Sequence, residues 1–273
     1  MNPVHGNAKM AGYAPVNGLQ MYYEIEGSGD PLVCIPPAFG CAGMKSFPAL
    51  TENHSVITMD LQGHGRTADI PERPMSLEQN AEDVVGLLRH LGISKADFFG
   101  ESYGGATAVM IAIKRADLVG RVATYGATFG PPQVALDMQM LRTSVPPVAD
   151  SQAFRFQREY YGKVAPDPAY WPRFWSKVVD IRWNGFSKEE LASLEAPVLI
   201  VQGDRDFVRT EHALDTFRLV PQAELAVIPN AGHFALFSEP ERVIPVVAGF
   251  LRQPRAMAPV ATAETGYQPG KTR

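Results

Sequence analysis

The chain has 273 residues, of which 45% are hydrophobic and 20% charged, and it carries a net charge of -4. This length and composition fit one large α/β domain or two small ones, with a core that needs no covalent staples. The mild negative charge, without a basic patch, excludes nucleic acid and anionic membranes as expected partners.

Cys34 and Cys41 are too few cysteines for a disulfide framework or a metal site, so we expect both to be structural. The first 16 residues lack a basic segment followed by an apolar one, which leaves no signal-peptide pattern. No apolar run reaches the length of a transmembrane helix. We therefore expect a cytoplasmic protein without metal or membrane partners, whose oligomeric state the sequence leaves open.

The predicted elements alternate between strands and helices. The first dozen residues predict a loose arm, and residues 18–26 alternate in the manner of an edge strand. Continuous apolar runs, typical of strands buried on both faces, follow at residues 32–35, 55–59, 95–99, 119–125, 197–201 and 224–228. Helices are expected at residues 76–91, 106–114, 211–219 and 240–251. This order predicts an α/β fold with a mainly parallel, doubly wound sheet covered by helices on both faces.

Residues 130–195 interrupt this alternation, because they contain no buried-strand run. They hold all three tryptophans together with many other aromatic residues and prolines. We expect a helical cap inserted before the strand at 197–201, with residues 1–129 and 196–253 as the core. The alternative is a helical subdomain whose aromatic side chains only form its own core. The small, polar tail at 254–273 is predicted to be disordered.

A serine between glycines follows the strand at 95–99, in the order Gly100, Ser102, Gly104. This spacing alone is weak evidence, but a strand before it and a helix after it strengthen it. Such a turn forces the serine into an unfavourable backbone conformation, so its neighbours two positions away must lack bulky side chains. The hydroxyl then stands exposed at the carboxyl end of a central strand. Ser102 is therefore the predicted nucleophile.

A serine hydroxyl needs a base to accept its proton. Among six histidines, His233 follows the last predicted strand, on the side of a parallel sheet where Ser102 also lies. The histidine in turn needs a carboxylate that orients it. Asp204 and Asp206 both follow the strand at 197–201, and on position alone either one serves.

These features resemble the α/β-hydrolase family over roughly residues 18–252. The chain order Ser, Asp, His is that of the family. Further similarity lies in Asp-Leu-Gln-Gly-His-Gly at 60–65, which resembles the family's D-x-x-G-H-G loop, and in Gly-His at 232–233 followed by Glu-Pro at 239–240. The family's G-x-x-D pattern implies Asp206 rather than Asp204 as the acid. It also implies a structural role for His64.

One position departs from the family, which normally has His-Gly where residues 36–40 read Pro-Pro-Ala-Phe-Gly. Pro37 has no N–H to donate, so by position Ala38 and Tyr103 are the predicted oxyanion donors. The two prolines either preorganise this oxyanion hole or misplace it. Glu101, beside the nucleophile, is expected to pair with an arginine or a backbone donor. The alternatives are recognition of a polar substrate group or a role as in serine carboxypeptidases, which are longer and disulfide-bonded.

The resemblance implies a serine hydrolase that cleaves a small, apolar carboxylic ester through an acyl-enzyme, without a cofactor. Phe39, Trp171, Trp175 and Phe234 are the expected substrate contacts. The same triad serves lactone, amide, thioester and C–C bond hydrolysis, and perhydrolysis. A serine nucleophile argues against dehalogenase and epoxide hydrolase chemistry. The alternative from a different class is a small-molecule binding or receptor protein with little turnover.

Overall fold

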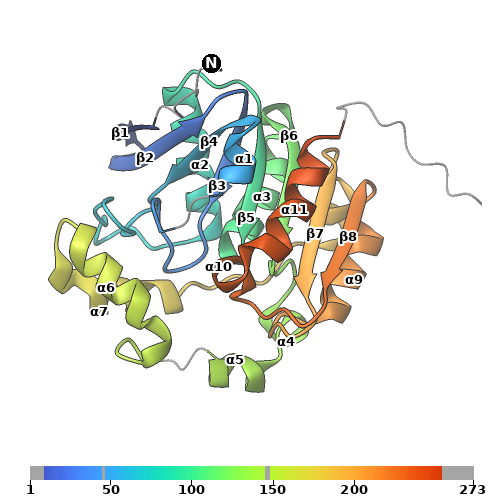
Figure 1. The fold of residues 1–273 in the computed structure, drawn as a ribbon. Coiled ribbons are helices and arrows are strands. Elements are labelled where there is room, and N and C mark those ends of the chain that lie inside the picture. The colour runs from blue at the N-terminus through green and yellow to red at the C-terminus, as the bar shows by residue number, and fades with distance from the viewer. Residues whose placement is uncertain (1–8, 45–46, 145–147, 254–273) are drawn as a thin grey trace, which may run out of the picture.

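The computed structural model describes residues 9–44, 47–144 and 148–253. They form an eight-stranded sheet in the order β1-β2-β4-β3-β5-β6-β7-β8 (Figure 1). The strands are β1 Lys9–Val16, β2 Leu19–Gly27, β3 Asp30–Ile35, β4 His54–Met59, β5 Ala96–Glu101, β6 Val119–Tyr125, β7 Val198–Gly203 and β8 Ala223–Ile228. Strands β3 to β8 are parallel to one another, whereas β1 and β2 run antiparallel to their neighbours. The predicted α/β fold class is confirmed.

Helices cover both faces of the sheet. One face carries α2 Leu77–His90, α3 Tyr103–Lys114 and α9 Thr210–Leu219, and the other carries α1 Pro48–Thr51, α10 Ala235–Ser238 and α11 Pro240–Leu251. Side chains alternate between two hydrophobic cores along each central strand. Val33 and Ile35 of β3 face the first core, and Leu32 and Cys34 face the second. This alternation explains why the central strands read as continuous apolar runs.

The first strand differs from the prediction. Residues 9–12 were expected in a loose arm and residues 18–26 at the edge of the sheet, but β1 pairs with β2 along its whole length and takes the edge position. Asn17 and Gly18 join the two strands, and both have positive φ values, 48° and 86°, as a tight hairpin turn requires. Only Ala14 and Val16 of β1 are buried, so the apolar alternation is too short to reveal the strand.

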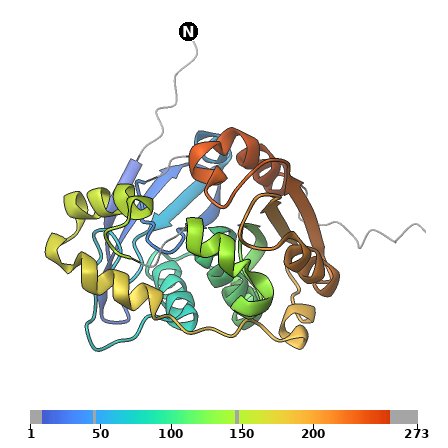
Figure 2. The same cartoon turned by 90° about the horizontal axis from the view of Figure 1, so that it is seen from below.

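A helical insertion lies between β6 and β7. Its helices are α4 Pro132–Ala135, α5 Met138–Ser144, α6 Arg155–Val164, α7 Trp171–Val179 and α8 Lys188–Ala192, with short 3₁₀ turns at Gln152–Phe154 and Pro168–Tyr170. Figures 1 and 2 show α5, α6 and α7 outside the end of the sheet where the parallel strands finish. The division of the chain into a core and a cap stays a prediction. The predicted disordered tail, residues 254–273, lies outside the described residues.

Lys177 of α7 anchors the insertion to the core. Its Nζ lies 2.9 and 2.7 Å from the two carboxylate oxygens of Asp69 and also donates to the carbonyls of Ile70 and Arg73. Tyr170 donates its hydroxyl to the same carboxylate. The Asp69 side chain is only 2% exposed, so this contact is shielded from solvent. Within the described ranges, no helix combines the length and apolarity needed to cross a bilayer.

Candidate active site

The turn between β5 and α3 holds Ser102 in a strained conformation. Its φ of 52° lies in the left-handed region, which a residue with a side chain adopts only at a cost. A Cβ on Gly104 would lie 2.2 Å from the carbonyl oxygen of Ile35, and one on Gly100 would lie 2.3 Å from the carbonyl oxygen of Gly104. Both positions therefore require glycine. The backbone N–H of Ser102 donates to the carbonyl of Tyr125 at 2.8 Å, which ties the turn to β6.

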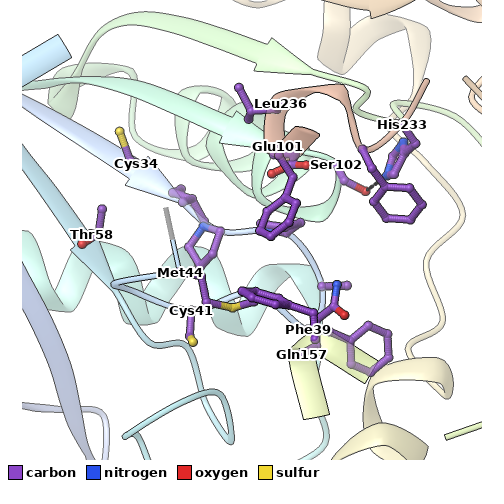
Figure 3. A pocket seen from close by; sticks show the side chains of 18 of the residues that line it. Cys34, Phe39, Cys41, Met44, Thr58, Glu101, Ser102, Gln157, His233 and Leu236 are labelled. Atoms are coloured by element: carbon purple, nitrogen blue, oxygen red, sulfur yellow. Dashed lines mark hydrogen bonds between the residues drawn. The ribbon is translucent and has the colours of Figure 1, made fainter. Parts of the chain in front are cut away.

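Three residues far apart in the sequence meet at this turn. The Oγ of Ser102 lies 3.0 Å from Nε2 of His233, and Figure 3 shows this contact at one side of a cavity. The Nδ1 of the same ring lies 2.9 and 3.1 Å from the carboxylate oxygens of Asp206. His233 and Asp206 are both buried, at 9% and 7% exposure. The geometry fits a hydroxyl, a base and an orienting carboxylate in hydrogen-bonded order.

Neighbouring groups fix the acid and the base. Asp206 also accepts a hydrogen bond from the N–H of Val208 at 2.8 Å. The hydroxyl of Tyr125 donates to the carbonyl of Gly232 at 2.6 Å, next to His233. A side chain at Gly126 would collide with the Asp206 carboxylate, since a Cβ there would lie 2.8 Å from it. The position and orientation of His233 are therefore set from β6 as well as from its own loop.

Asp204 has a different place from Asp206. It is exposed, and its carboxylate accepts a hydrogen bond from the N–H of Ala231 at 3.3 Å. Asp204 therefore ties the loop after β7 to the loop after β8. The structure brings Asp206, and not Asp204, to the histidine.

Of the two predicted oxyanion donors, Tyr103 follows the serine in the sequence and Ala38 lines the same cavity. Tyr103 is the first residue of α3, so its N–H is among the initial helix donors that have no partner inside the helix. Ala38 lies in the wall of the cavity that Ser102 also lines. Beside it, Phe39 has a φ of 64°, and the N–H of Gly40 closes the turn onto the carbonyl of Pro37 at 2.9 Å. The Pro-Pro segment thus forms an ordered turn, and the role of both donors stays a prediction.

The cavity has a volume of about 590 Å³. Its wall is mainly apolar and includes the predicted contacts Phe39 and Phe234. The inner wall belongs to the sheet, because the register pairs Cys34 of β3 with Thr58 of β4 and with Phe99 of β5. The outer wall belongs to the insertion, which contributes Leu141, Ser144, Phe154, Phe156 and Gln157. A mostly apolar cleft of this size is typical of small-molecule sites.

The structure does not bring the two predicted tryptophans to this cavity. Neither Trp171 nor Trp175 is among the described residues that line it. Trp171 is 4% exposed and packs against Tyr161 and Phe174, with ring centroids 5.5 and 5.7 Å apart. Trp175 contacts Phe154 within the same cluster. These rings form a cluster of the insertion that also packs against Met75 and Phe39 of the rest of the chain.

The residues of the insertion that do line the cavity were not identified from the sequence. Phe154, Phe156 and Gln157 come from the start of α6 and the 3₁₀ turn before it. The aromatic composition of residues 130–195 pointed to this segment but not to individual positions. Their orientation depends on how the insertion packs against the core, which no local pattern records.

The cavity wall also contains two thiols and one carboxyl group, from Cys34, Cys41 and Glu101. Cys34 and Cys41 are free, buried and in the wall, and burial raises the pKa of Cys34 to about 12 and that of Cys41 even further. Both are therefore neutral thiols and poor nucleophiles. Glu101 is 4% exposed and lines the cavity beside Ser102; its expected pairing with an arginine or a backbone donor stays a prediction.

His64 lies in the loop after β4 and is not among the described residues that line the cavity. It is 3% exposed, its Nδ1 lies 2.9 Å from the carbonyl oxygen of Gln62, and its ring meets Phe174 edge-on. Burial lowers the pKa of His64 to about 4. A neutral, packed imidazole fits the structural role that the sequence resemblance implied.

Comparison with known proteins identifies the family of this chain and agrees with the observed fold. Residues 32–246 match the model described as the alpha/beta hydrolase family. The mouse sn-1-specific diacylglycerol lipase ABHD11 is 26% identical over 220 residues, which cover 72% of this chain and 71% of that protein. The Pseudomonas putida 2-hydroxy-6-oxononadienedioate/2-hydroxy-6-oxononatrienedioate hydrolase 2 is 25% identical over 276 residues, which cover 86% and 92%.

Solved structures extend this likeness to the fold. The 2-hydroxy-6-oxo-6-phenylhexa-2,4-dienoate hydrolase from Rhodococcus sp. strain RHA1 superposes with a TM-score of 0.74 at 20% identity, over 91% of this chain and 100% of that chain. A lipase structure from Acinetobacter baumannii, described there as putative, gives a TM-score of 0.75 at 18% identity, over 89% and 91%. At these identities the likeness concerns the fold alone.

Proposed function

The chain belongs to the alpha/beta hydrolase family, and from this premise we propose that it is a serine hydrolase that cleaves a small carboxylic ester through an acyl-enzyme. The observation that carries the proposal is the hydrogen-bonded order of Ser102, His233 and Asp206 at the wall of an apolar cavity. A hydroxyl held 3.0 Å from an imidazole, which is itself 2.9 Å from a buried carboxylate, is arranged for proton transfer.

In the proposed mechanism, the Oγ of Ser102 attacks the ester carbonyl while Nε2 of His233 takes its proton. The carbonyl oxygen becomes an oxyanion, which the N–H groups of Ala38 and Tyr103 stabilise. The tetrahedral intermediate then breaks its bond to the alcohol, and His233 gives the proton to the leaving oxygen. Asp206 holds Nδ1–H and stabilises the charged ring.

Water completes the cycle by the same steps. His233 takes a proton from a water molecule, whose oxygen attacks the acyl carbon bound to Ser102. The bond to Oγ breaks, the proton passes from His233 to Oγ, and the carboxylic acid leaves. Each oxyanion donor typically contributes on the order of 10² to 10³ in rate, so the ordered turn at residues 36–40 bears directly on turnover.

The substrate class follows from the cavity wall. Phenyl rings and aliphatic side chains dominate it, which favours a neutral, mostly apolar ester. The names of relatives agree with this class, since they include a diacylglycerol lipase and a Haemophilus influenzae protein described as a putative esterase/lipase. The cytoplasmic location and the small-molecule partner stay predictions.

A second candidate is hydrolysis of a carbon–carbon bond next to a ketone. It is favoured by the similarity to the Pseudomonas putida 2-hydroxy-6-oxo acid hydrolase, which covers 86% of this chain and 92% of that protein. The same serine and histidine would act on the ketone carbonyl. No specific observation favours lactone, amide or thioester hydrolysis, perhydrolysis, or binding without turnover.

A fluorophosphonate probe tests the proposal. Wild-type protein is expected to be labelled, and Ser102→Ala is expected to remain unlabelled, because the probe reacts only with an activated serine. Absence of labelling in both proteins would contradict a serine hydrolase. Turnover of p-nitrophenyl butyrate alongside a 2-hydroxy-6-oxodienoate then separates the two candidates, and the ester is expected to react with the higher kcat/KM.

A further inference from the structure

A polar atom without a partner lies in the outer wall of the cavity. Gln157 of α6 lines the cavity, and its Oε1 is buried without a hydrogen bond. Among the described residues, no other buried side-chain atom that lacks a hydrogen-bond partner belongs to the cavity lining. Figure 3 shows the amide of Gln157 among the side chains that face the cavity.

The wall that the insertion contributes to the cavity is mainly apolar. Phe154 and Phe156 come from the same segment as Gln157, and the ring of Phe154 lies 4.8 Å from that of Phe39. A buried amide oxygen without a donor costs free energy of folding, whereas an apolar side chain of similar size at that position would not. An unpartnered buried polar group calls for an explanation, and in a binding site the missing partner arrives with the ligand.

We propose that Gln157 determines specificity by accepting a hydrogen bond from a hydroxyl or N–H group of the substrate, remote from the scissile ester. The inference rests on the proposed function and narrows its substrate class to apolar esters that carry one such donor. Ser102 belongs to the core and Gln157 to the insertion, yet both line one cavity of about 590 Å³. A single substrate therefore contacts the nucleophile from one wall and Gln157 from the other.

Matched substrates isolate this hydrogen bond. The p-nitrophenyl esters of 6-hydroxyhexanoate and heptanoate differ by one hydroxyl in place of one methyl group in the acyl part. The butyrate esters of 1,6-hexanediol and 1-heptanol place the same difference in the alcohol part. Wild type is expected to prefer the hydroxyl member of one pair by about 5- to 100-fold in kcat/KM. This is the effect expected of one hydrogen bond to a group that the protein already holds in position.

Gln157→Leu keeps the approximate size of the side chain and removes its polar atoms, so the preference for the hydroxyl member is expected to disappear. Phe156→Leu is the matched control from the same wall, because it is expected to change both members of a pair by the same factor. The melting temperature of Gln157→Leu is expected to equal or exceed that of wild type, since the unpartnered atom is gone. Gln157→Met is a second apolar variant, and it is also expected to lose the preference for the hydroxyl member.

The outcomes separate this inference from the proposed function. If the fluorophosphonate probe labels Ser102 but Gln157→Leu retains the wild-type ratio for both pairs, the role of Gln157 is wrong and the serine hydrolase stands. If no ester is turned over, binding of the same pairs to Ser102→Ala and to Ser102→Ala/Gln157→Leu decides. If Ser102→Ala binds the hydroxyl member with the lower Kd and Ser102→Ala/Gln157→Leu does not, the role of Gln157 is supported. If both variants give the same ratio of Kd values within each pair, that role is wrong.

Discussion

Asp204 and Asp206 stand two residues apart after β7, but only Asp206 reaches the imidazole, at 2.9 Å. Asp206→Asn is therefore expected to lower kcat by about 10⁴, because an amide cannot hold the reactive tautomer of His233. Asp204→Asn is expected to change kcat less than tenfold, since its carboxylate contacts the N–H of Ala231 and the exposed Arg205 side chain rather than the imidazole. Hydrolysis of p-nitrophenyl butyrate measures both, and the reverse order of effects would make Asp204 the acid.

The buried His64 makes stability depend on pH. Its pKa is about 4 in the folded protein against about 6.5 in an unfolded chain. Between these values the unfolded state binds more protons, so the free energy of unfolding falls as the pH drops from 6.5 to 4. His64 accounts for up to about 3 kcal/mol of this fall.

Urea unfolding of wild type and His64→Asn at pH 7, 5.5 and 4.5 measures this contribution. The difference in unfolding free energy between the two proteins is expected to shrink as the pH falls, because Asn does not titrate. A difference that stays constant over this range would show that His64 titrates normally.

At the residue level, the sequence predicted the groups whose positions follow from strand order. Ser102, His233 and Asp206 each follow a parallel strand, and such strands end on one side of the sheet. Gln157 and the misplaced Trp171 show the opposite case. Both lie in a segment without strands, where the direction of a side chain depends on packing between elements and leaves no local pattern.

At the level of elements, the contact between α7 and the loop after β4 holds the insertion. Lys177→Met removes the cation from Asp69, whose side chain is 2% exposed. We expect a loss of about 3 kcal/mol of unfolding free energy, because a buried carboxylate loses its charged partner. The matched control is Arg158→Met, which breaks an ion pair with Asp150, a side chain 85% exposed; it is expected to cost less than about 1 kcal/mol.

Chemical denaturation measures both variants, and a larger loss for Arg158→Met would contradict the anchoring role of Lys177. Adding Asp69→Asn to Lys177→Met is expected to restore part of the lost stability, since the unpaired charge is then absent.

The elements themselves were predictable to different degrees. The helix α2 was expected at residues 76–91 and spans Leu77–His90, and the Ser76 side chain caps it by accepting a hydrogen bond from the N–H of Gln79 at 3.1 Å. Local chemistry sets both ends of this helix. Strand β1 was missed because its pairing with β2, rather than its own composition, makes it a strand.

At the level of the whole molecule, the insertion contributes one wall of the cavity, and the strands and loops of the rest of the chain contribute the remainder. With a volume of about 590 Å³, the cavity is expected to favour short acyl chains. We expect p-nitrophenyl butyrate to be cleaved with at least tenfold higher kcat/KM than p-nitrophenyl palmitate. A chain-length series from two to sixteen carbons measures this preference, and a maximum among the longest chains would contradict it.

The contact between Ser102 and His233 spans 131 positions of the chain. The turn that holds Ser102 follows β5 in the middle of the sheet, whereas His233 follows β8, the outermost strand on that side. A refolding molecule that has assembled its sheet only as far as β6 therefore holds the serine but lacks its base. Labelling by the fluorophosphonate probe would then appear only after β8 has joined the sheet, so it would report fully folded molecules. The circular-dichroism signal of the helices would also report molecules that are only partly folded.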